Sequence, residues 1–67
     1  MKDYAELAKQ LSKPGIRTSK LQLAFDALEF ASGDVSTAKA IVAKQSVRIA
    51  ARTWHTAIHA RLALLNQ

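Results

Sequence analysis

Residues that interrupt helices are confined to two places in this chain of 67 residues. The only proline is followed directly by a glycine, at Pro14 and Gly15, and the only other glycine is Gly33. A β protein needs more turns than these two breaks provide. Most of the apolar residues are alanine and leucine, and both are strong helix formers. The sequence therefore predicts an all-α protein, a small three- or four-helix domain spanning residues 1–67 with a long C-terminal helix.

Apolar residues recur at three- and four-residue steps between these breaks, which is the spacing of an amphipathic helix. We predict helices at about residues 3–13, 20–32, 35–45 and 46–65. The last two can be continuous, because no glycine or proline follows Gly33. A break at Ser46, which can cap a separate last helix, is favoured, since a globule of this size has little use for a rod of about 45 Å.

The second predicted helix has the widest apolar surface. Only Gln22, Asp26 and Glu29 form a polar stripe along it, at steps of four and three residues. A helix that is apolar around most of its circumference is buried on more than one side, so we expect this helix at the centre of the fold. The aromatic residues are expected in the core: Tyr4, Phe25, Phe30 and Trp54.

The chain contains no cysteine, which excludes disulfides and thiolate metal sites. Small scaffolds usually gain support from a disulfide, a metal or a partner subunit. The C-terminal segment offers a second apolar face, and a second copy of the chain is the simplest cover for it. We therefore predict a homodimer. Its interface, or the interface with another partner, is expected to contain Ile49, Ala57, Ile58, Leu62, Leu64 and Leu65.

Basic residues outnumber acidic ones by ten to five, which gives a net charge of +5. This balance favours encounter with nucleic acid, an anionic surface or an acidic protein. Two arginines and two histidines recur at helical spacing in the C-terminal segment, and the guanidinium fork of arginine matches phosphate oxygens and guanine edges. A solvated helix face is the alternative for the same side chains. The predicted nucleic-acid contacts are Lys39, Lys44, Arg48, Arg52, His55 and His59.

His55 and His59 have the i, i+4 spacing of a zinc-binding pair, but a zinc site needs a third and usually a fourth ligand. The chain has no cysteine, and no acidic residue follows Asp34, so neither a metal nor a cofactor is expected. The sequence also has no glycine-rich phosphate loop and no nucleophile elbow. We expect a binding protein and not an enzyme.

A corner between two helices is predicted at residues 31–40, which read ASGDVSTAKA. This stretch resembles the entry to the helix-turn-helix of Fis-type DNA-binding domains, in which a glycine and a small polar cap precede an alanine-rich helix. The resemblance implies a DNA-binding dimer whose second motif helix carries Arg48 and Arg52. The chain departs from that family at the inter-helix turn, where Ala43 and Lys44 replace the usual glycine and apolar residue. The same stretch is similar to a turn of ubiquitin-associated-type three-helix modules, which bind proteins.

We predict a small nucleic-acid-binding regulator that presents a helix-turn-helix-like corner and a basic helix face to its partner, most simply duplex DNA. The alternative is a protein-binding inhibitor or adaptor that docks through an apolar helix face, with basic side chains steering it to an acidic partner. No segment approaches the ~18 apolar residues of a membrane helix, and the N-terminus resembles no secretory signal. A cytoplasmic protein without membrane contact is therefore expected.

Overall fold

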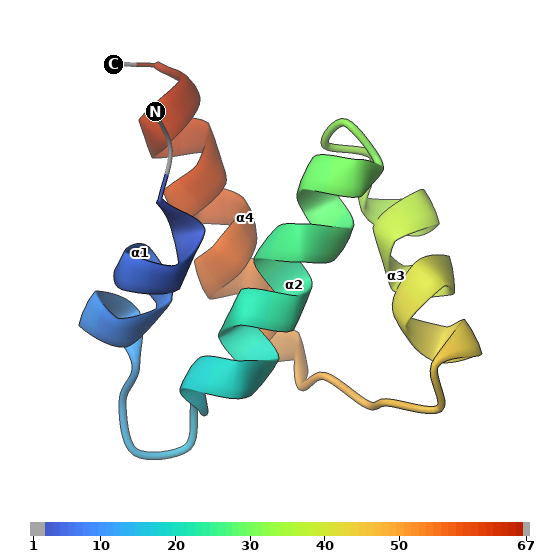
Figure 1. Ribbon diagram of the computed structural model, residues 1–67, viewed down its shortest axis with the longest axis horizontal. Coiled ribbons are helices and arrows are strands. Elements are labelled where there is room, and N and C mark those ends of the chain that lie inside the picture. Colours follow the sequence, from blue (N-terminus) through green and yellow to red (C-terminus); the bar gives the residue numbers. More distant parts are fainter. Residues whose placement is uncertain (1–2, 67) are drawn as a thin grey trace.

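The fold consists of four helices joined by short connections. The computed structural model describes residues 3–66 and contains, within that range, α1 (Tyr4–Leu11), α2 (Thr18–Phe30), α3 (Val35–Lys44) and α4 (Ala51–Leu65). Residues 1, 2 and 67 of the predicted domain lie outside the described range. The helices alternate in direction, so the α1–α2 and α3–α4 connections lie at one end and the α2–α3 connection lies at the other (Figure 1). The all-α prediction is confirmed.

The central helix is α2, and each of the other helices packs against it. Its Leu21, Phe25 and Leu28 are the largest fully buried side chains. The ring of Phe25 stacks on Tyr4 of α1 with 5.0 Å between the ring centroids, and Trp54 of α4 belongs to the same core. The wide apolar surface of this segment therefore places it at the centre, as the sequence predicts.

The two predicted breaks form tight turns. Between α1 and α2, the N–H of Ile16 donates to the carbonyl of Lys13 at 2.8 Å, and Gly15 adopts φ +91°. After α2, Ser32 and Gly33 both adopt positive φ, and the Gly33 N–H donates at 2.8 Å to a carbonyl five residues earlier. Glycine populates positive φ without the steric penalty that a β-carbon brings, which explains why both glycines stand at these turns.

The predicted start of the last helix is wrong by five residues. α4 begins at Ala51, and residues 45–50 form an irregular connection, so the last two helices are not continuous. Ser46, with φ +59°, follows the end of α3 and does not cap α4. Val47 is half-buried and Ile49 is buried, an alternation typical of extended chain. Burial of these two β-branched side chains holds the segment extended up to the start of α4.

The predicted dimer interface lies partly inside the protein's own core. Ile49 and Ala57 are buried against the other core residues of the same chain, so their assignment to an interface is wrong. The physical reason is that α4 and the connection before it use these apolar side chains to cover the core around α2. The remaining members of the predicted interface are half-buried or exposed: Ile58, Leu62, Leu64 and Leu65.

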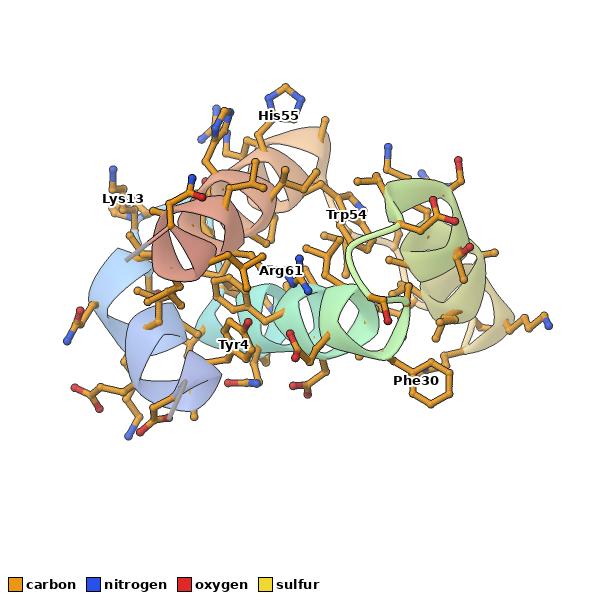
Figure 2. All side chains as sticks on the ribbon, turned by 90° about the horizontal axis from the view of Figure 1, so that it is seen from above. Tyr4, Lys13, Phe30, Trp54, His55 and Arg61 are labelled. Carbon is orange, nitrogen blue, oxygen red and sulfur yellow. The ribbon has the colours of Figure 1, made fainter. Side chains whose placement is uncertain are left out.

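Phe30 does not lie in the core, contrary to the prediction. It is the last residue of α2, is 83 % exposed, and projects from α2 on the side away from α4 (Figure 2). Phe30 follows Asp26 by four positions, and residues at that spacing lie on the same face of a helix. Its side chain therefore shares the solvent-facing side of α2 with a charged residue. Tyr4, Phe25 and Trp54 are buried or half-buried as expected.

Candidate functional site

The predicted basic stripe lies only partly on a helix. Arg48 is in the connection before α4, where its backbone carbonyl accepts a hydrogen bond from Lys20 Nζ at 3.1 Å. Arg52, His55 and His59 lie on α4 and are exposed. The placement of Arg48 on the same helix is therefore wrong, because helical spacing applies only after α4 has begun at Ala51.

Arg52 links the start of α4 to the α1–α2 turn. A β-carbon built on Gly15 would lie 3.1 Å from the Nη1 atom of Arg52, so the guanidinium group lies against this turn. Lys13 and Arg17, both exposed, stand on either side of the turn in the sequence. Cations that are far apart in the chain are thus brought together where α4 begins.

The α1–α2 and α3–α4 connections lie at the same end of the molecule (Figure 1), and six cationic residues lie on them or on the adjoining helix turns. They come from the two connections and from the adjoining turns of α2, α3 and α4. We call this surface the basic end, and its members are Lys13, Arg17, Lys20, Lys44, Arg48 and Arg52. All are exposed except Lys20, which is half-buried. The predicted contacts Lys44, Arg48 and Arg52 therefore lie in one surface.

Three members of the basic end were not predicted as contacts: Lys13, Arg17 and Lys20. They were missed because they belong to the α1–α2 connection and the first turn of α2, whereas the prediction considered only cations from Lys39 onward. The sequence does contain a signal for them, since no acidic residue stands between Glu6 and Asp26.

The acidic residues lie outside the two connections of the basic end. Two lie at the start of α1, two in the second half of α2 and one just before α3. These residues are Asp3, Glu6, Asp26, Glu29 and Asp34. Asp26 lines the same groove as Gln45, the residue that follows Lys44. Asp3 accepts a hydrogen bond from the Glu6 N–H at 3.1 Å, and Asp26 accepts one from the Gln22 amide at 2.8 Å. Within residues 3–66, the two connections of the basic end therefore contain no carboxylate side chain, whereas cations also lie elsewhere, at Lys9, Lys39 and Arg61.

Arg61 forms a separate cluster with Glu29 and Tyr4. Its Nε atom lies 3.4 Å from Glu29 Oε2, which also accepts a 3.0 Å hydrogen bond from the Tyr4 hydroxyl. Figure 2 shows the Arg61 side chain directed from α4 toward α2. Burial, and after it the hydrogen bond to Glu29, raises the pKa of Tyr4. The cluster joins α1, α2 and α4, so Arg61 has a structural role and is not part of the basic end.

His55 and His59 extend the basic end along α4. Their rings lie 6.4 Å apart between centroids at an interplanar angle of 74°, and His55 points outward from α4 (Figure 2). In the described part of the chain, no group of three or more His, Cys, Asp or Glu side chains is placed to hold a metal ion. Lys39 is exposed in the middle of α3 and is not a member of the basic end.

Comparison with protein-family models, curated proteins and solved structures found no match to this chain. The helix corner predicted at residues 31–40 is present between α2 and α3, but the two family resemblances of this stretch stay predictions. Each helix in the described range is too short or too polar to cross a membrane.

Proposed function

We propose that this protein is a small homodimeric regulator that binds the phosphate backbone of duplex nucleic acid, and that it is not an enzyme. The observation that carries the proposal is the basic end, where six cationic residues lie on or beside two connections that contain no carboxylate side chain. Duplex DNA presents one negative charge per about 1.7 Å of its axis, and each phosphate that a cation neutralises releases counterions and favours binding.

The arrangement of the basic end suits a double helix. The first turn of α4 carries Arg52, followed by His55, and an α-helix fits the major groove, which is about 12 Å wide. Arg17 and Arg48 come from the connections beside this turn. Arginine pairs with phosphate oxygens through two parallel N–H groups. In the proposed complex, the start of α4 enters the groove and the two connections contact the flanking phosphates.

Two helix N-termini add to the positive potential of this surface. α2 and α4 both begin at the basic end, and within the described residues neither helix start has a side-chain cap. The first N–H groups of a helix carry a partial positive charge of about +0.5 and bind phosphate readily. The backbone N–H groups and the cationic side chains of the basic end therefore both favour a negatively charged ligand.

The helix-turn-helix-like corner of this proposal consists of α3 and α4, which pack on α2 and not closely on each other. Their connection, residues 45–50, is longer than the three- or four-residue turn of the common motif. In this proposal α4 takes the place of the second motif helix, because its start bears exposed polar side chains while Trp54 and Ala57 hold it against the core.

The test is a fluorescence-anisotropy titration of a labelled random duplex at several salt concentrations. The double variant R17A/R48A removes two exposed cations of the basic end. The matched control K9A/K39A removes two exposed cations elsewhere, so both variants lose the same charge. Each lost phosphate contact lowers the slope of log K against log salt by about 0.9. We expect R17A/R48A to lower the slope by about 2 and K9A/K39A to leave it unchanged.

Two results contradict the proposal. One is no binding of the duplex by micromolar wild-type protein at low salt. The other is an equal loss of slope in R17A/R48A and K9A/K39A, because this outcome assigns binding to net charge and not to the basic end.

A protein-binding adaptor or inhibitor is the second candidate. Leu62 and Leu65 on the last turns of α4 are 50 % and 44 % exposed, and exposed apolar patches mark interaction surfaces. For this function, L62S/L65S should abolish capture of a protein partner from nuclease-treated lysate, and R17A/R48A should slow association without abolishing capture. Loss of all binding on nuclease treatment contradicts this candidate.

A further inference from the structure

An apolar groove runs between α2 and α3. It has a volume of about 290 Å³, and its lining residues are Leu23, Asp26, Ala27, Phe30, Ile41 and Gln45. Phe30 stands at the end of α2, 83 % exposed, and projects from the side that α4 does not cover (Figure 2). One surface of the protein thus combines a protruding aromatic ring with an apolar hollow.

The hollow is large enough to hold an aromatic ring. Small-molecule pockets of about 300–1,000 Å³ hold drug-sized ligands, so a groove of about 290 Å³ accommodates one aromatic side chain. Phe30 cannot fill the groove of its own chain, because it forms part of the wall. In a two-fold dimer each patch meets its own copy, so Phe30 of each chain can enter the groove of the other.

We propose that the α2–α3 groove docks a second copy of this chain, with Phe30 of each protomer seated in the groove of its partner. The broad face that α2 and α3 help to form measures 31 by 28 Å in Cα extent. A face of this size can supply the ~800 Å² per partner that a stable interface buries. In this proposal the groove takes the place of the α4 interface predicted from sequence. Part of that predicted interface is buried in the core of the protomer itself.

Charges on the two rims of the groove select the orientation of the dimer. Asp26 lines the groove from α2 and is exposed, and Lys44 is exposed on α3, one turn after the groove residue Ile41 and next to the groove residue Gln45. With the two-fold axis along the helices, the α2 rim of one protomer faces the α3 rim of the other, and Asp26 approaches Lys44 twice. With the axis across the helices, the two α2 helices meet and like carboxylates approach each other. Attraction of opposite charges favours the first arrangement.

This orientation points both basic ends in the same direction, because a rotation about an axis along the helices leaves their ends on the same side. The two basic ends would then contact one duplex together and neutralise more phosphates than one protomer does. This consequence rests on the proposed function, whereas the dimer itself does not.

Sedimentation equilibrium of the full chain, without nucleic acid, tests the dimer. We expect wild-type protein to dimerise in the micromolar range and Phe30→Glu to raise the dissociation constant at least about a hundred-fold, because a central aromatic anchor is lost from each protomer. Leu65→Glu, at an exposed apolar site outside the groove, is the matched control and should leave the constant unchanged. Circular dichroism should show both variants folded, since both side chains are exposed.

A charge swap tests the orientation. Asp26→Lys and Lys44→Asp should each weaken the dimer about ten-fold by placing like charges together, and the double variant should restore the wild-type constant. A wild-type monomer at millimolar concentration, an unaffected Phe30→Glu dimer, or a swap that does not restore dimerisation would overturn the proposal. If the protein binds duplex in a salt-dependent way as a monomer, the proposed dimer is contradicted and nucleic-acid binding is not. If the protein dimerises but does not bind duplex, nucleic-acid binding is contradicted and the dimer is not.

Discussion

Replacement of Gly33 by alanine is expected to lower the free energy of unfolding by about 2 kcal/mol. Gly33 adopts φ +89°, and a left-handed backbone costs a residue with a β-carbon about 1–2 kcal/mol. The new β-carbon would also lie 2.8 Å from Arg61 Nη1, so the guanidinium group must move. That movement weakens its 3.4 Å contact with Glu29, a partly exposed ion pair worth at most about 1 kcal/mol.

Urea unfolding followed by circular dichroism measures this loss, and Gly15→Ala is the matched control. Gly15 has almost the same φ, +91°, but its β-carbon would stand 3.1 Å from Arg52, which forms no ion pair with a carboxylate among residues 3–66. Gly15→Ala therefore reports the backbone cost. We expect Gly33→Ala to exceed it by up to about 1 kcal/mol, the contribution of the Arg61 pair.

The Arg61→Ala background separates the two contributions. In that background, Gly33→Ala has no guanidinium group to displace, so its cost should fall to that of Gly15→Ala. An equal cost of Gly33→Ala with and without Arg61 would refute the packing of the arginine against this turn. A neutral Gly33→Ala would refute the left-handed backbone at Gly33.

Three further expectations concern the core and the tyrosine. Phe25→Ala removes a fully buried ring and should lower the unfolding free energy by about 3–5 kcal/mol in urea. Ala57→Leu should lower the unfolding free energy by about 1–3 kcal/mol, because the larger side chain overpacks the core. Leu62→Ala, at a half-exposed position, should lower it by less than about 1 kcal/mol. A larger loss for Leu62→Ala than for Ala57→Leu would place Ala57 at the surface. The pKa of Tyr4 is raised above 10.0, so the folded protein holds this proton more tightly than the unfolded chain. Its contribution is fully present below pH 10 and is lost as the pH rises through the folded-state pKa; thermal melts of Tyr4→Phe should lack this alkaline loss.

The number and order of the helices were predictable because their determinants are local. Pro14, Gly15 and Gly33 occupy backbone positions that end helices, and Asp3 accepts a hydrogen bond from the third residue of α1 as a helix cap does. The central place of α2 followed from its apolar circumference alone. Each of these predictions used residues within one turn or one helix of the feature concerned.

The start of α4 and the exposure of Phe30 were not predictable in the same way. Val47 and Ile49 fit a helical pattern in sequence, but tertiary burial favours the extended connection, and tertiary context overrides helix propensity. Phe30 is as apolar as Phe25, and only the direction from which α3 and α4 approach α2 decides which ring is buried. Both outcomes depend on contacts between helices that no local pattern specifies.

The basic end results from the alternating directions of the helices and not from any single sequence motif. Two stretches without acidic residues, 7–25 and 35–66, each contain a connection that the alternating helices bring to the same end. The molecule extends 31 × 28 × 17 Å, whereas charges are screened over about 10 Å at 0.1 M salt. Carboxylates at the far end therefore do little to offset the electrostatic field at the basic end. The net charge of +5 understates the attraction that this end would exert on the proposed nucleic-acid ligand, because it subtracts the distant carboxylates.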